Sequence, residues 1–292
     1  MTPKNGFLPG RLLLSAILII LASCTGGQGN LNNNADRSAS PDTLGMIRRI
    51  DSFKKAGYPM TDLHAHLKGG LTLEDVMAYS RLTGITYGIA ANCGLGFPIT
   101  GDSALMVYYH SLDGYPFARG LQAEGREWIK LFSPDSVAKF DYAFTDAMTF
   151  TDDKGRRTRL WMKDEVWVDD EQAFMDMLVD RITGIMENEP INIYVNATFI
   201  PAIIQDKYDE LWTPERMDRV ISAAVNNHIA IEIGARYNIP SATFIKRAKA
   251  AGATFTMGTN NTNKDLGFLT YCMDMIETCN LKPADFFTVE KD

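Results

Sequence analysis

Two histidines stand two residues apart in the segment Thr61-Asp62-Leu63-His64-Ala65-His66. They are half of the four histidines in this chain of 292 residues. On a β-strand, side chains at positions i and i+2 point to the same face, so both imidazoles can reach one point, as a metal ion requires. The spacing predicts a metal site. The alternative is a pair of polar residues at a strand end with no ligand.

Arginines near predicted strand ends could bind an anion. Arg236 follows a strand that ends in Glu232-Ile233, and Arg126 and Arg119 lie near another strand. A guanidinium group can hold a phosphate or a carboxylate through two parallel hydrogen bonds. The alternative is that these arginines pair with nearby acids on the rim.

Two further reactive side chains have simpler interpretations. Cys93 follows a predicted strand, but His110 and His228 fall on connecting segments or helices, so a buried thiol is favoured over a nucleophile. Asp62, next to the histidine pair, is interpreted as a structural acid rather than a catalytic base.

The elements that would position these residues alternate between strands and helices. Amphipathic helices are predicted after a Thr72-Leu73-Glu74-Asp75 capping box, over 171–186, after Thr213-Pro214, from Ser241 to about Ala251, and over 265–278. Seven strands are predicted at 61–65, 86–91, 120–124, 141–144, 191–199, 229–233 and 254–257. This alternation is typical of a parallel α/β barrel, in which chemistry lies at the carboxyl ends of the strands. The polar segment 151–157 is predicted to be an insertion on the rim.

The N-terminus has the three-part layout of a secretory signal that ends in a cysteine. Lys4 and Arg11 precede an apolar run, and Leu21-Ala22-Ser23-Cys24 follows it. This last segment resembles the lipobox of bacterial lipoproteins, in which the cysteine is acylated. We expect residues 1–23 to be a signal peptide and Cys24 to carry a lipid that anchors the chain at the cell envelope. A transmembrane helix is the alternative, but the apolar run is about half the roughly 20 residues that a span needs.

The rest of the chain divides into a short tether and one domain. Residues 24–41 are rich in Gly, Asn and Ser, which predicts a flexible tether, and residues 42–292 form the predicted domain. Removal of residues 1–23 takes away Lys4 and Arg11 and changes the formal net charge from −7 to −9. No cluster of basic residues remains, so a nucleic-acid partner is not expected. Cys93, Cys272 and Cys279 are predicted to be free thiols.

Three segments of the domain resemble the PHP (polymerase and histidinol phosphatase) superfamily of metal-dependent phosphoesterases. They are Asp62-Leu63-His64-Ala65-His66, the run from Ile231 to Ser241, and the run from Phe244 to Gly252, with a continuation into Gly258-Thr259-Asn260. The resemblance covers about Tyr58 to Phe287. It implies a single-domain α/β fold, a distorted seven-stranded TIM-like barrel.

The resemblance also implies three metal ions, but the ligand set in this chain is incomplete. His64 and His66 match the family pattern, and Glu124 matches the bridging glutamate. Where the family has Asp-His, His, His-Pro and Asp-x-His, this chain has Asn92-Cys93, Asp146, Asn196 and Asn260-Asn261-Thr262. A site without most of its anionic ligands cannot hold three divalent ions, whereas two histidines and one carboxylate can hold one.

The sequence therefore leads to two hypotheses. In the first, the chain is an exported, lipid-anchored hydrolase of the phosphoesterase class that acts on a small molecule with one zinc, manganese or iron ion at His64, His66 and Glu124. Asp146 would be the general base, Arg236 the anion anchor, and Arg126, Asn92, Asn196 and Asn260 would contact the substrate. In the second, the barrel is catalytically inactive, holds no metal, and binds a ligand at the envelope.

Overall fold

The computed structural model describes residues 41–289. The predicted signal peptide, the predicted lipid site at Cys24 and the tether up to residue 40 lie outside the described residues. Pro41, the last residue of the predicted tether, is the first residue of helix α1 (Pro41–Lys55), which the sequence did not predict. The described residues belong to one compact unit.

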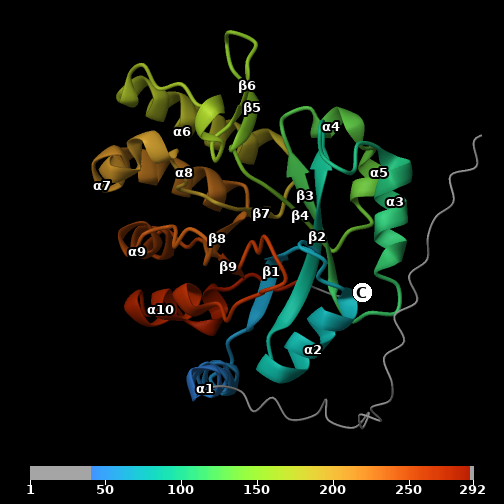
Figure 1. Ribbon diagram of the computed structural model, residues 1–292. Coiled ribbons are helices and arrows are strands. Elements are labelled where there is room, and N and C mark those ends of the chain that lie inside the picture. The colour runs from blue at the N-terminus through green and yellow to red at the C-terminus, as the bar shows by residue number, and fades with distance from the viewer. Residues whose placement is uncertain (1–40, 290–292) are drawn as a thin grey trace, which may run out of the picture. The chain divides into compact units, whose positions relative to one another are not determined.

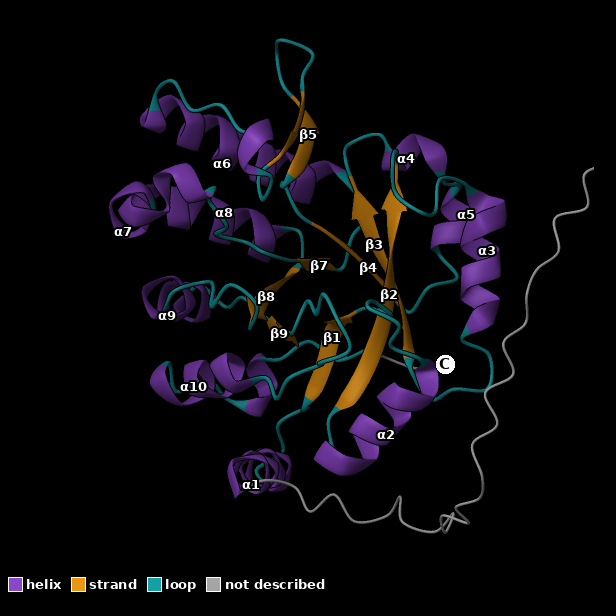
Figure 2. Ribbon diagram, in the orientation of Figure 1, coloured by secondary structure: helices purple, strands orange, loops and turns teal. Residues whose placement is uncertain are grey.

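Seven parallel strands close into a barrel in the order β1-β2-β3-β4-β7-β8-β9 (Figures 1 and 2). The seven strands predicted from the sequence are the seven strands of this barrel, and the predicted fold class is confirmed. The barrel strands are β1 (Thr61–Ala65), β2 (Thr86–Gly94), β3 (Ala118–Glu124), β4 (Tyr142–Thr145), β7 (Ile193–Tyr194), β8 (Ala230–Gly234) and β9 (Phe255–Gly258).

Helices cover the outside of the barrel. Figure 1 shows α6, α8, α9 and α10 stacked along one side, and α2 and α3 on the other. The helices are α2 (Leu73–Thr83), α3 (Asp102–Ser111), α4 (Trp128–Leu131), α5 (Pro134–Val137), α6 (Glu171–Asn188), α7 (Tyr208–Leu211), α8 (Pro214–Asn226), α9 (Ala242–Ala250) and α10 (Thr270–Thr278), with 3-10 turns at Lys163–Glu165, Ala202–Lys207 and Pro283–Asp285.

The predicted helix starts are confirmed where a side chain caps the first turn. The Thr72 hydroxyl accepts a hydrogen bond from Asp75 N, and the Asp75 side chain accepts one from Thr72 N. The hydroxyls of Thr213 and Ser241 cap α8 and α9 in the same way. Each cap satisfies a backbone donor that the first helical turn leaves without a partner.

Two predicted boundaries are wrong. The strand predicted over 191–199 is limited to Ile193–Tyr194, because the backbone turns at Asn196, whose φ of 51° lies in the left-handed region. The helix predicted over 265–278 begins only at Thr270. Before it, the side chains of Asn263 and Asp265 accept hydrogen bonds from backbone groups two residues further on, which favours turns over helix.

A hairpin of β5 (Thr149–Thr151) and β6 (Arg157–Arg159) stands on the rim, outside the barrel. Its strands are antiparallel, and Figure 1 shows it projecting beyond the ends of the barrel strands. The predicted rim insertion is confirmed. The segment after β6 returns across the top of the barrel and carries Trp161.

A cluster of apolar side chains fills the barrel interior. Tyr142 lies at its centre, and its hydroxyl donates a hydrogen bond to Leu63 O. The ring fits because glycines face it: a Cβ at Gly88 would lie 2.3 Å from the Tyr142 hydroxyl, and one at Gly120 would lie 2.5 Å from it. The other members of this cluster are Leu63, Ala90, Ala118, Phe144, Ile193, Val195 and Ala230.

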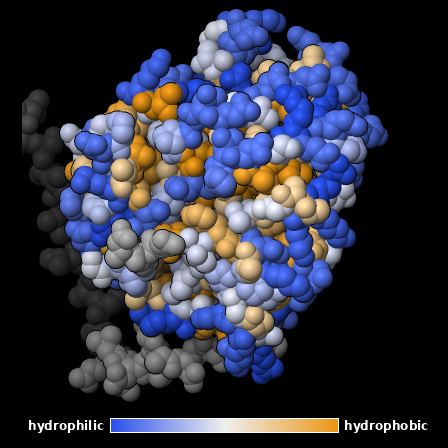
Figure 3. All heavy atoms as spheres, turned by 180° about the vertical axis from the view of Figure 1, so that it is seen from behind, coloured by the Kyte–Doolittle hydropathy of each residue, from blue (hydrophilic) through white to orange (hydrophobic). Residues whose placement is uncertain are grey.

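The three cysteines in the described residues, Cys93, Cys272 and Cys279, are free and buried, as predicted. Hydrophilic residues cover most of the face seen in Figure 3, and hydrophobic side chains show between them in smaller patches. No helix within residues 41–289 combines the length and the apolar character needed to cross a membrane.

Candidate functional site

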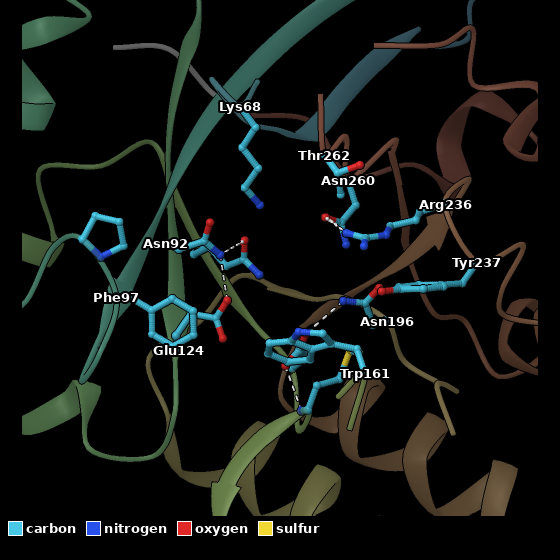
Figure 4. Close-up of a pocket in the computed structure, with 14 residues that line it drawn as sticks. Lys68, Asn92, Phe97, Glu124, Trp161, Asn196, Arg236, Tyr237, Asn260 and Thr262 are labelled. Carbon is cyan, nitrogen blue, oxygen red and sulfur yellow. Dashed lines mark hydrogen bonds between the residues drawn. The ribbon is translucent and has the colours of Figure 1, made fainter. Parts of the chain in front are cut away.

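A pocket of about 420 Å³ opens at the carboxyl ends of the barrel strands (Figure 4). Its volume falls within the range of roughly 300–1,000 Å³ typical of small-molecule sites. It is lined by Lys68, Asn92, Phe97, Pro98, Gln122, Glu124, Asp146, Met148, Trp161, Asn196, Arg236, Tyr237, Asn260 and Thr262. Six of the residues selected from the sequence are among them, so the barrel brings together side chains that are up to 168 residues apart in the chain, from Asn92 to Asn260.

The two histidines are buried at the end of β1, and one nitrogen of each ring is anchored. His64 Nδ1 lies 2.5 Å from Glu232 Oε1, and His66 Nδ1 lies 2.8 Å from Ala90 O. The carboxylate of Glu232 also accepts a hydrogen bond from Asn196 N. Gly258 leaves the space for this contact, because a Cβ there would lie 2.1 Å from Glu232 Oε1.

The other nitrogen of each ring is buried and has no hydrogen-bond partner. This applies to Nε2 of both His64 and His66. Burial, with the nearby charge of His64, lowers the pKa of His66 well below its ordinary value, so its imidazole is neutral at physiological pH. A histidine that is held through Nδ1 and has a neutral, unshared Nε2 is in the state that binds a metal ion.

The described residues do not form a complete set of metal ligands. Within residues 41–289, no three His, Cys, Asp or Glu side chains are arranged as a group that could hold a metal ion. Glu124, the predicted third ligand, accepts hydrogen bonds from Asn92 Nδ2 and the Thr149 hydroxyl. His64 and His66 fit a metal, whereas Glu124 would have to exchange these bonds to join them, so the predicted set of three stays a prediction.

Glu124 and Asp146 form a buried pair of carboxyl groups in the pocket wall. Burial, followed by the charge of Asp146, raises the pKa of Glu124 to about 8. Burial also raises the pKa of Asp146, but hydrogen bonds from Asn196 Nδ2 and Met148 N oppose the shift. At neutral pH Glu124 is therefore mostly protonated, which removes one negative charge from the pocket wall.

Three asparagines of the pocket form hydrogen bonds with charged groups of its wall. Asn92 Nδ2 donates to Gln122 Oε1 as well as to Glu124 Oε1. Asn196 Nδ2 donates to Asp146 Oδ2 at 2.9 Å, and Asn260 Oδ1 accepts from Arg236 Nη1 at 3.4 Å. The amides thus bind the charged groups of the pocket wall directly.

Two cations face the pocket without an acidic partner. Neither Lys68 nor Arg236 forms an ion pair with any residue in the described part of the chain. Burial lowers the pKa of Lys68; the nearby charge of Glu124 opposes this shift, and the charge of Arg236 adds to it. Arg236 stacks on the ring of Tyr237, with its guanidinium carbon 4.9 Å from the ring centre. Figure 4 shows both cations reaching into the same pocket.

The other candidate residues lie away from the pocket. The guanidinium of Arg126 donates to Glu189, to the Thr145 hydroxyl and to Asp146 O, so it does not line the pocket and its predicted contact with substrate has no support here. Arg119 is the second residue of β3, far from the carboxyl end, and pairs with Asp113. Both arginines pair with nearby acids, which is the alternative that the sequence left open.

The surroundings of Cys93 and Asp62 indicate structural roles for both residues. The Cys93 thiol is fully buried, and burial raises its pKa, which removes the thiolate that a nucleophile needs. Asp62 accepts hydrogen bonds from His64 N and from the backbone and hydroxyl of Thr259, and it joins β1 to the loop after β9.

Sequence reasoning missed several residues of the site. Lys68 lies three residues beyond β1, and Phe97, Trp161 and Tyr237 lie in loops without a periodic pattern. Glu232 was noted only as part of a strand. Its position in the second half of the predicted strand 229–233 was the one available indication, because side chains near the carboxyl ends of barrel strands converge.

Comparison with known proteins supports the fold. No protein-family model and no curated protein sequence matches the chain. Among solved structures, it is similar to a histidinol phosphate phosphatase from Lactococcus lactis subsp. lactis, solved with zinc, L-histidinol and phosphate. The TM-score is 0.55 at 12% identity, and the match covers 76% of this chain and 94% of the phosphatase.

An archaeal ribonuclease P structure with mature tRNA also aligns, over 75% of this chain and 90% of that chain at 11% identity. Its TM-score of 0.34 is too low to indicate a shared fold. The closed barrel of seven parallel strands and the match to the phosphatase together show that this chain has the PHP-type, TIM-like barrel fold.

Proposed function

We propose that this chain is a lipid-anchored hydrolase of the cell envelope that binds a small anionic ester in the pocket and cleaves it with one divalent metal ion. The observation that carries the proposal is the pair of buried Nε2 atoms of His64 and His66, which have no partner while both Nδ1 atoms are anchored. Burying such a nitrogen without a hydrogen bond costs roughly 1–3 kcal/mol, which a ligand to that nitrogen would offset.

The residues of the pocket have distinct tasks in this proposal. Lys68 and Arg236 bind the anionic group of the substrate, because neither has an acidic partner of its own. Asp146 accepts a proton from the attacking water, and Glu124 holds the proton that the carboxyl pair retains. A zinc, manganese or iron ion at His64 and His66 would supply an activated water and polarise the ester.

A metal analysis tests this proposal with the full chain, purified in detergent without chelator. We expect about one equivalent of zinc, manganese or iron in the wild type, and none in the double variant His64→Ala/His66→Ala. The matched control is His110→Ala/His228→Ala, which removes two exposed histidines outside the pocket. Circular dichroism establishes whether both variants are folded. A wild type without metal after soaking in these ions, or equal metal in all three proteins, contradicts the proposal.

A second candidate is a barrel that binds its ligand without metal or hydrolysis. The observation that favours it is the set of amides, because Asn92, Asn196 and Asn260 satisfy the charged groups of the pocket without an ion. The same preparations distinguish the two functions. Ligand binding that persists in chelator, with no cleavage of any phosphate or carboxylate ester after metal is added, would favour this second function.

The anchoring part of the proposal rests on Leu21-Ala22-Ser23-Cys24 and the apolar run before it. Expression in a bacterium with a labelled fatty acid tests it. We expect the label in the wild type and not in Cys24→Ser, together with loss of the variant from the membrane fraction. Label in both proteins would contradict lipidation at Cys24.

A further inference from the structure

We propose that the ligand of this pocket is a sugar that carries an anionic group, either a phosphate ester or a carboxylate. This inference rests on the proposed function, because it assigns the substrate class of the same pocket. Three features carry it: aromatic rings in the walls, amides whose second polar atom has no partner, and two unpaired cations on one side.

Aromatic side chains from three separate segments meet at the pocket. Phe97 follows β2, Trp161 follows the rim hairpin, and Tyr237 follows β8 (Figure 4). Trp161 is 38% exposed although it is large and apolar, whereas Tyr237 is supported by Phe199 at 4.8 Å between ring centres. A pyranose ring has C–H faces that pack on aromatic rings, while its hydroxyl groups point outward at the edge. An exposed indole at a pocket mouth is suited to such a face.

The amides provide both donors and acceptors for the hydroxyl groups. One end of each is bound within the wall, and Asn92 Oδ1, Gln122 Nε2, Asn196 Oδ1 and Asn260 Nδ2 have no hydrogen-bond partner in the described part of the chain. A fully ionised phosphate only accepts hydrogen bonds, so it cannot satisfy the oxygens of Asn92 and Asn196. A sugar hydroxyl both donates and accepts, and can satisfy either kind of atom.

The two cations lie opposite two of the aromatic rings, whereas the third, Tyr237, stacks on Arg236. Figure 4 shows Lys68 and Arg236 on one side of the pocket and Phe97 and Trp161 on the other. A ligand that fills the pocket therefore presents an anionic group to the cations and an apolar face to Trp161. An aromatic anion would match these two features but would displace water from the amide atoms without replacing its hydrogen bonds. Sites built to hydrogen-bond hydroxyl groups strongly reject analogues that lack them.

Calorimetry on the full chain in detergent tests this inference. The ligands are the 6-phosphates and the uronic acids of glucose, galactose and mannose, the three neutral hexoses, inorganic phosphate and phenyl phosphate. We expect at least one anionic sugar to bind about tenfold more tightly than its neutral parent, inorganic phosphate and phenyl phosphate. The comparison of 6-phosphates with uronic acids identifies the anionic group.

Two tryptophan variants make the test specific. Trp161→Ala should weaken binding of the preferred sugar about tenfold and change phosphate affinity less than about twofold, because it removes the ring contact and no charge. Trp167→Ala is the matched control: Trp167 is 41% exposed in the same segment, stacks on Arg156 and lies outside the pocket. It should change neither affinity.

The outcomes separate this inference from the proposed function. Phenyl phosphate binding as tightly as every anionic sugar, no binding by any ligand, or no effect of Trp161→Ala would each overturn the sugar assignment. Tight binding of an anionic sugar without hydrolysis in any metal would retain the assignment and contradict the hydrolase. Hydrolysis of simple phosphate esters with no preference for sugars would contradict the assignment and retain the hydrolase.

Discussion

The charged groups behind the pocket wall and those that face the pocket differ in whether they form ion pairs. Behind the wall, Arg126 and Trp128 both donate to Glu189, and Arg126 reaches Thr145 and Asp146 as well. Lys68 and Arg236, which line the pocket, form no ion pair in the described part of the chain, whereas Arg126 pairs with Glu189. Unpaired buried atoms occur in both regions, at Nε of Arg126 and at Nε2 of His64 and His66, so the difference between the regions is one of charge pairing.

The first prediction concerns Glu232, which has the largest expected effect because it is part of the fold and holds His64. Glu232→Ala leaves the Nδ1–H of His64 and the backbone N–H of Asn196 without an acceptor in a site that is 1% exposed. We expect the free energy of unfolding to fall by roughly 3–5 kcal/mol, as for other broken buried pairs. Urea denaturation measures this. Glu232→Gln keeps an acceptor and should lose less; equal losses in both variants would show that the acceptor is not what matters.

The second prediction compares two arginines directly. Arg126→Met should lower the free energy of unfolding by roughly 2–3 kcal/mol, because Glu189 loses its partner in a largely buried position. The folded fraction should still bind anions normally. Arg236→Met should change stability by less than about 0.5 kcal/mol and weaken anion binding about tenfold. An equal loss of anion affinity in Arg126→Met and Arg236→Met would contradict the assignment of anion binding to Arg236 alone.

The third prediction concerns the pH dependence of stability. Burial raises the pKa of Glu124 to about 8 in the folded protein. At a pH between the ordinary pKa of a glutamate and about 8, the folded protein therefore keeps a proton that the unfolded chain has already released. Stability is therefore lost as pH rises through this window. In chelator, Glu124→Gln should match the wild type at about pH 5 and be more stable at about pH 8.5. A parallel pH profile for the two proteins in urea denaturation would contradict the protonated state of Glu124.

The fold could be predicted from the sequence because its local patterns agree with the barrel. The apolar runs specify all seven strands, and Thr72, Thr213 and Ser241 specify helix starts. The boundary errors occur where side chains compete with regular structure, at Asn196 and at Asn263 and Asp265. A periodic pattern does not report these local hydrogen bonds.

The candidate site could be predicted only in part. Residues directly after strands, such as Asn92, Asp146 and Asn260, were found because strand ends converge. The pairing of His64 with Glu232 spans 168 residues and depends on strand order, which no local pattern encodes. Trp161 was missed because the rim insertion has no counterpart in the barrel repeat. The predicted substrate contact of Arg126 stays a prediction, and sequence position could not show that its side chain pairs with Glu189.

The apolar cluster around Tyr142 inside the barrel limits the routes by which a ligand can reach the pocket. It separates the pocket at the carboxyl ends of the strands from a second cavity at the amino ends, which Thr61, Thr86 and Ala118 line together with Phe287. A ligand of the pocket therefore cannot pass through the barrel interior and has to enter and leave on the side of the carboxyl ends. In the proposed hydrolysis, a product that keeps the anchoring anion would then compete with the next substrate molecule for the pocket.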